Sequence, residues 1–199
     1  MKLFYSPNSP YVRKVMMAAI ELGLADSLHK NAVTLSPYEP NPGVTAENPL
    51  GKIPVMVTTD CGTLFDSIVI AEYLSLQKED TVLFPKDAVR RMTALTLNAL
   101  ADGMLEAAQL MRFESVRPEN FRYDKWSEAQ KAKLDRSFAY LEANLPDDFD
   151  IGAIALASTI GWLDFRFPDL HWREGAPRLA DWFAQVALRD SFAKTNPPT

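Results

Sequence analysis

Two short segments of the sequence place hydroxyl and carboxyl side chains where helices are expected to begin. Ser9 stands directly before Pro10, and Asp66 stands directly before Ser67. Serine and aspartate are common helix N-caps and proline fits the first helical position, so both pairs can serve as simple caps. The same positions can also hold an anion, because backbone N–H groups at a helix N-terminus point toward it. Local sequence leaves both interpretations open.

The residues that usually build metal sites or disulfides are scarce. Cys61 is the single cysteine, and it lies in a predicted hairpin turn, where we interpret it as incidental. One cysteine excludes a disulfide framework and a cysteine-rich metal site. His29 and His171 are far apart in the sequence and have no evident partners. The sequence therefore predicts no metal.

Composition narrows the class of protein. The chain has 199 residues, of which 47% are hydrophobic and 24% charged, and a net charge of −5. This balance allows a folded core, whereas a nucleic-acid surface would need clustered lysine and arginine. No run approaches the ~20 apolar residues of a membrane helix, and prolines interrupt the N-terminal segment before a signal-peptide region can form. We therefore expect a cytoplasmic protein that binds neither membranes nor nucleic acid.

Residues 1–78 alternate strand and helix patterns, which predicts an α/β domain. The pattern gives a β-α-β unit, then a β-hairpin, then a helix, so a parallel crossover is extended by antiparallel strands. The expected strands are 2–5, 28–35, 54–58 and 63–65, and the expected helices are 10–22 and 68–77.

Residues 88–199 show helical spacing without convincing strands, which predicts an all-α bundle joined to the first domain by a linker at 79–87. Ile151 to Leu163 is apolar nearly all round, as expected of a central helix, with Asp150 as its cap. Pro177 fits the first position of a later helix. The other expected helices cover 89–111 and 130–145.

Four segments, taken in order, resemble the cytosolic glutathione S-transferase family, in the bacterial form with serine at the active-site turn. They are residues 6–15, 48–55, 65–68 and 161–166. The resemblance spans the chain and implies a thioredoxin-like N-terminal domain, an all-α C-terminal bundle and a homodimer. One departure is Ala153, which occupies a position where relatives usually carry an acid in the capping box of the buried helix.

The resemblance implies that glutathione is the co-substrate and that Ser9 is catalytic, with Ser6 and Asn8 as competitors for contact with the thiol. A free thiol has a pKa near ~8.5, and lowering it by ~2 requires ~2.7 kcal/mol. A hydrogen bond to a charged group contributes ~1.5–3 kcal/mol, and a helix N-terminus adds ~0.3–1. One hydroxyl could therefore supply most of the stabilisation of the thiolate. Without a cysteine in the turn, disulfide exchange is not expected.

The remaining glutathione contacts also follow from the resemblance. It implies a cis bond before Pro54 and places the backbone of Val55 against the cysteinyl backbone of glutathione. Without the resemblance, base rates favour a trans bond and a proline that starts an edge strand. It also places Ser67 and Asp66 at the γ-glutamyl end. The predicted binding residues are Lys52, Ile53, Pro54, Val55, Asp66 and Ser67.

The second substrate is predicted to be a small hydrophobic electrophile. Methionine and aromatic residues at helical spacing more often belong to a core, and the pocket candidates of this kind are Tyr11, Met104, Ala108, Met111 and Phe165. Asp102 is either a solvated helix residue or a group that reaches glutathione across the dimer. The favoured hypothesis is a conjugating enzyme. A regulator that binds glutathione or a protein partner on the same fold, and a peroxidase or isomerase, remain alternatives.

Overall fold

The computed structural model describes residues 1–79 and 82–198. The chain forms two compact units, here called the first unit (Met1–Arg91 with Arg189–Thr199) and the second unit (Met92–Leu188). Residues 80 and 81 of the predicted linker lie outside the described residues, and residues 82–87 form neither helix nor strand.

The first unit contains a four-stranded sheet in the order β2-β1-β3-β4. β1 pairs in parallel with β2 and antiparallel with β3, which pairs antiparallel with β4. This confirms the predicted crossover and hairpin, although β2 is shorter than the expected strand. The strands are β1 (Lys2–Tyr5), β2 (His29–Ala32), β3 (Val55–Val57) and β4 (Thr63–Leu64).

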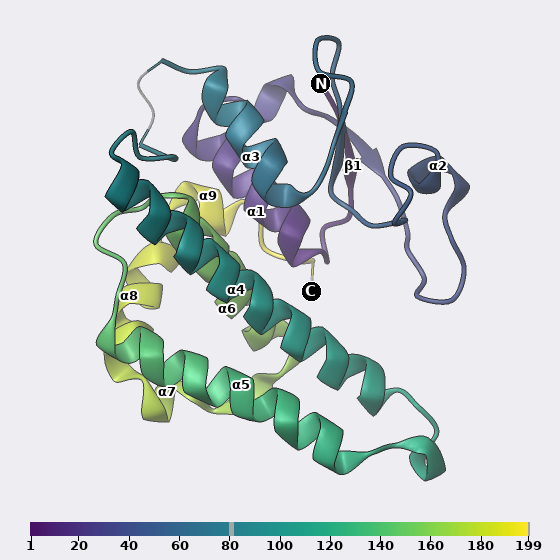
Figure 1. The fold of residues 1–199 in the computed structure, drawn as a ribbon, viewed down its shortest axis with the longest axis vertical. Helices are drawn as coiled ribbons and strands as arrows, with labels where there is room; N and C mark the ends of the chain where they lie inside the picture. The colour runs from purple at the N-terminus through teal and green to yellow at the C-terminus, as the bar shows by residue number, and fades with distance from the viewer. Residues whose placement is uncertain (80–81, 199) are drawn as a thin grey trace. The chain divides into compact units, whose positions relative to one another are not determined.

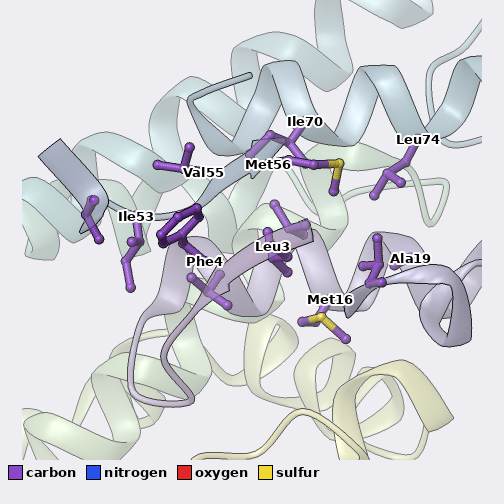
Figure 2. Close-up of a cluster of buried hydrophobic side chains, with 13 residues drawn as sticks. Leu3, Phe4, Met16, Ala19, Ile53, Val55, Met56, Ile70 and Leu74 are labelled. Carbon is purple, nitrogen blue, oxygen red and sulfur yellow. The ribbon is translucent and has the colours of Figure 1, made fainter. Parts of the chain in front are cut away.

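Helices α1 (Pro10–Glu21) and α3 (Ser67–Leu76) pack against each other beside the sheet, and α2 (Pro42–Thr45) lies on the other side of β1 (Figure 1). The sequence did not indicate α2 or the 3-10 turn η1 (Ala25–Ser27), because both are too short to show periodicity. The core between sheet and helices is apolar. It brings Leu3 from β1, Met56 from β3 and Ile70 from α3 into one buried cluster (Figure 2).

The first unit also includes α9 (Asp190–Ala193), which contacts α1. The guanidinium of Arg13 donates to the carbonyl of Phe192 at 3.2 Å and to Asn196 Oδ1 at 2.6 Å, and it lies 3.9 Å from the ring centroid of Phe192. Burial lowers the pKa of Arg13 to about 10. The predicted helical domain, 88–199, includes this segment, whereas in the structure residues 189–198 pack with the first unit because Arg13 and its neighbours hold them there.

The second unit is all helical, as predicted. Its central helix, α6 (Ile151–Arg166), is buried without interruption from Ile151 to Ile160. Asp150 caps α6, its Oδ1 accepting from the N–H groups of Gly152 at 2.9 Å and Ala153 at 3.2 Å. No helix among residues 1–79 and 82–198 is long and apolar enough to span a membrane. The other elements are α4 (Ala88–Ser115), η2 (Glu119–Phe121), α5 (Asp124–Ala143), η3 (Pro168–Leu170), α7 (Trp172–Gly175) and α8 (Pro177–Ala187).

Close packing of α6 on α4 depends on Gly152. A Cβ at this position would lie 2.6 Å from the carbonyl oxygen of Ala94 and 2.9 Å from Leu97 Cβ. We therefore expect Gly152→Ala to lower the free energy of unfolding by about 1–3 kcal/mol, as overpacked cores do. Gly103→Ala is the matched control, since a Cβ there meets nothing within 4 Å on exposed α4 surface. It should stabilise by about 0.4–1 kcal/mol. Urea denaturation measures the free energy of unfolding of both variants. Equal values for Gly152→Ala and Gly103→Ala would contradict the close packing at Gly152.

Candidate functional site

The turn between β1 and α1 carries the predicted catalytic hydroxyl. Ser9 is the N-cap of α1, and its Oγ accepts from the N–H of Val12 at 3.3 Å. Its own N–H donates to the carbonyl of Ser6 at 3.1 Å. Ser6 and Ser9 are half-buried, and Asn8 is exposed. The structure thus confirms the cap, while the choice among Ser9, Ser6 and Asn8 for contact with a thiol stays a prediction.

The loop before β3 has the predicted backbone geometry. The Ile53–Pro54 peptide bond is cis, as the resemblance implied. Val55 opens β3 opposite Phe4 in β1, and the residue is fully buried. Lys52 is exposed, and its carbonyl accepts from Asn48 Nδ2 at 2.9 Å.

The start of α3 combines a cap with a buried hydroxyl. Asp66 is the N-cap, and its Oδ1 accepts from the N–H of Ile68 at 3.2 Å, while its side chain remains exposed. Ser67, only 1% exposed, accepts a hydrogen bond at Oγ from Lys14 Nζ at 3.1 Å. A serine hydroxyl has one donor and two acceptor lone pairs. Because Lys14 is the donor here, the Ser67 hydroxyl can give its own hydrogen to another acceptor.

Lys14 is a candidate site residue that sequence reasoning missed. It is 0% exposed, with Nζ 5.7 Å from the ring centroid of Tyr11. A buried ammonium is stable only when it is hydrogen-bonded or paired, and its charge acts strongly in such surroundings. Lys14 therefore adds positive charge beside the N-terminus of α3, which itself favours anions.

These three segments converge at one end of the sheet. Val55 pairs with Phe4, two positions before Ser6, so the Pro54 loop adjoins the turn that leads to Ser9. The hydrogen bond between Lys14 and Ser67 joins α1 to the start of α3. The N-termini of α1 and α3 and the first residue of the interior strand β3 therefore belong to the same end of the sheet. Such an end can bind a peptide-like ligand with a carboxylate at one terminus and an anionic group near Ser9.

The predicted electrophile-pocket residues fall in both units. Tyr11, in the first unit, is half-buried. In the second unit, Met104 and Ala108 are buried within α4, whereas Met111 is half-buried and Phe165 is 37% exposed. Met111 and Phe165 therefore retain surface for a ligand, and Met104 and Ala108 contribute to the core of the second unit.

Asp102 lies half-buried on α4, and its Oδ2 accepts from Asn98 Nδ2 at 2.9 Å. Its role across a dimer stays a prediction.

The part of the chain that the structure describes contains no group of histidine, cysteine, aspartate and glutamate suited to hold a metal ion. Cys61 is exposed in the turn between β3 and β4.

Comparison with protein families identifies both halves of the chain. Residues 8–77 match the model of the glutathione S-transferase N-terminal domain, and residues 124–185 match that of the C-terminal domain. The chain belongs to the glutathione S-transferase family. The N-terminal match contains Ser9, Pro54 and Ser67, so the candidate site of this transferase family member lies within the shared domain.

Similar proteins support the same assignment. This transferase family member is 33% identical to the uncharacterized GST-like protein YibF of Escherichia coli K12, over 100% of its own length and 99% of that protein. A glutathione transferase family member from Pseudomonas fluorescens Pf-5 with bound glutathione is 41% identical, with a TM-score of 0.95 and coverage of 100% and 99% of the two chains. The same family member with bound S-(propanoic acid)-glutathione superposes with a TM-score of 0.91, at 40% identity and full coverage of both chains.

Proposed function

We propose that this protein is a glutathione S-transferase that joins the glutathione thiolate to a small hydrophobic electrophile. The observation that carries the proposal is the convergence of Ser9, Val55 and Ser67 at one end of the sheet. Glutathione bound in the 41% identical Pseudomonas structure supports the choice of co-substrate.

Each element of the site has a separate task in this proposal. The Ser9 hydroxyl donates to the thiolate sulfur at the N-terminus of α1, which favours the ionised thiol over the neutral one. The backbone of Val55 aligns the cysteinyl residue of glutathione as an added strand. Ser67, held by Lys14, donates to the γ-glutamyl carboxylate, and Asp66 accepts from the γ-glutamyl ammonium. Lys52 lies near the glycyl end.

Conjugation is favoured over thiol binding alone by the ligand of a similar protein. S-(propanoic acid)-glutathione, bound in the 40% identical Pseudomonas structure, carries a substituent on the sulfur, as a product of conjugation does. By similarity, we propose that this protein forms thioethers of the same kind, including ones whose substituent ends in a carboxylate. In the second unit, Met111 and Phe165 keep exposed surface that an apolar ligand can contact. A homodimer in the cytoplasm, with Asp102 reaching the partner's glutathione, is part of the same proposal.

The proposal predicts saturable glutathione binding and turnover with at least one electrophile. We expect calorimetric titration to give binding that Ser67→Ala weakens by about 10-fold or more, since a hydrogen bond to a charged group contributes about 1.5–3 kcal/mol. Ser75→Ala is a suitable control, because Ser75 is also buried in α3 but lies near the other end of the helix. Turnover is measured with aryl halides, enones, epoxides and halogenated acids. Binding without any turnover would favour a regulator, and no binding at millimolar glutathione would reject the site.

A further inference from the structure

The segment that connects α2 to β3 in the first unit has one buried side chain. Residues 46–54 form neither helix nor strand. Between Val44 and Ile53 the buried residue is Asn48, which is only 2% exposed. Its neighbours are half-buried or exposed, so apolar packing does not fix the path of this segment. A polar residue in such a position is retained inside a protein only when its amide is hydrogen-bonded.

Asn48 binds the main chain that follows it at three points. Its Oδ1 accepts from the N–H of Leu50 at 3.0 Å, and its carbonyl accepts from the N–H of Gly51 at 2.8 Å. Its Nδ2 donates to the carbonyl of Lys52 at 2.9 Å. Within the described chain, every hydrogen bond that residues 49–52 form ends on Asn48. This residue therefore sets the path of the loop as far as the carbonyl of Lys52.

Asn48 is itself fixed relative to the sheet. Its N–H donates to the carbonyl of Val44 at 2.8 Å, and Val44 is fully buried in the apolar cluster of the first unit. The preceding residue, Glu47, accepts at Oε2 from Thr63 Oγ1 of β4 at 2.6 Å. Asn48 thus joins a well-anchored part of the first unit to a loop that has no other hydrogen-bonded support.

The loop leads directly into the backbone that is proposed to receive glutathione. Val55 pairs with Phe4 of β1, whereas β4 pairs only with the two residues that follow Val55. Among the described residues, the first residue of β3 therefore has a strand partner on one side. Pro54 has no N–H with which the sheet could hold the chain just before it. The direction of the main chain that enters β3 then depends on the peptide group after Lys52.

We propose that Asn48 is a positioning residue of the glutathione site, which orients the backbone of Val55 by holding the carbonyl of Lys52. The role rests on the proposed function, and it concerns a residue that does not itself touch the ligand. Hydrogen bonds weaken steeply as their geometry departs from linear. A small rotation of the Val55 backbone would therefore weaken its pairing with the cysteinyl N–H of glutathione and leave the γ-glutamyl contacts at Ser67 in place.

The test compares two ligands that differ in one N–H group. S-methylglutathione and its analogue with an ester in place of the γ-glutamyl–cysteinyl amide are titrated by calorimetry into the full chain. The methylated sulfur removes thiol ionisation from the comparison. We expect the wild type to bind the amide about 10-fold more tightly, because the ester leaves the carbonyl of Val55 unpaired. Asn48→Asp keeps the size and the acceptor but loses the Nδ2 donor, so the preference should fall to about twofold or less.

Asn41→Asp is the matched control. Asn41 Oδ1 also accepts from an N–H two residues later, that of Gly43 at 3.0 Å, and its Nδ2 also donates to a carbonyl, that of Thr34 at 3.3 Å. The same substitution therefore removes a similar hydrogen bond elsewhere in the first unit, and the preference for the amide should persist. Asn48→Ala introduces no buried charge and provides the same comparison if Asn48→Asp fails to fold.

The outcomes separate this role of Asn48 from the proposed function. A preference that is lost in the Asn48 variants and kept in Asn41→Asp supports it. Equal wild-type affinity for the two ligands overturns it while glutathione binding remains established. A preference that survives in both Asn48 variants, or is lost in Asn41→Asp as well, also overturns it. If the wild type does not bind S-methylglutathione, the proposed function is rejected together with the role of Asn48.

Discussion

Replacing Ser9 by alanine is expected to lower turnover at neutral pH by about ten- to a hundredfold. The hydroxyl is proposed to donate to the glutathione thiolate, and a hydrogen bond to a charged group contributes about 1.5–3 kcal/mol. Losing that energy corresponds to a rise of about one to two in the pKa of the bound thiol. The fraction of bound glutathione that is ionised at neutral pH falls accordingly, and the turnover rate falls in proportion to that fraction. Glutathione affinity should change little, because Val55, Ser67 and Lys14 remain.

The pH dependence distinguishes this role from a structural one. The hydroxyl depresses the pKa of the bound thiol. It therefore increases the turnover rate between the depressed pKa and the unperturbed pKa. Above the unperturbed pKa the thiol ionises without help, and the hydroxyl no longer affects the rate. The Ser9→Ala rate should therefore approach the wild-type rate as pH rises, and the pH–rate profile should move to higher pH. Ser9 also caps α1, so its loss removes about 1 kcal/mol of stability, which thermal unfolding measures separately.

Variants of the same turn provide the controls. Ser9→Thr keeps a hydroxyl and should retain most activity. Ser6→Ala and Asn8→Ala remove the two competing side chains and should leave the profile unchanged. If Ser6→Ala moves the profile and Ser9→Ala does not, the thiol contact belongs to Ser6 and the assignment of Ser9 is wrong.

Replacing Lys14 by methionine is expected to weaken glutathione binding by about 100-fold. In the proposed complex the ammonium lies one hydrogen bond beyond Ser67, about 6 Å from the γ-glutamyl carboxylate. At an effective dielectric constant near 20, opposite charges at that distance attract by about 3 kcal/mol. Methionine fills a similar volume, so the first unit should remain folded. Calorimetric titration of glutathione measures the change.

A double-mutant cycle tests whether Lys14 acts through Ser67. If the two residues form one anchoring unit, the effects of Lys14→Met and Ser67→Ala on binding free energy should be non-additive by about 1 kcal/mol or more. Arg13→Met is the matched control. Arg13 is also buried in α1, but it contacts residues 192–196. It should reduce stability and leave glutathione affinity near the wild-type value. Wild-type affinity in Lys14→Met would remove Lys14 from the site.

Features that depend on near neighbours could be predicted from the sequence. Ser9, Asp66 and Asp150 each cap a helix by accepting an N–H two or three residues later, and that relationship is visible in the local sequence. The apolar run from Ile151 likewise identified the buried central helix because every face of it is apolar. The strands of the first domain followed from alternation between turn residues.

Features that depend on distant contacts could not be predicted. Lys14 gains its role from Ser67, 53 residues away, and Arg13 from Phe192, 179 residues away. The apolar stripe of residues 10–22 suggested one buried face, yet α1 is buried on every side from Val12 to Ala19 because the sheet, α3 and α9 surround it. Helical periodicity cannot identify polar residues that are buried by such tertiary packing.

The return of residues 189–198 to α1 makes the first unit discontinuous in the chain. During translation the ribosome releases the whole of residues 92–188 before the segment that Arg13 holds. Domains generally fold as units and in the order of synthesis. In this protein the N-terminal unit cannot complete its packing until the inserted helical unit has emerged. The helices of the second unit are therefore available to fold before the surface around α1 is complete.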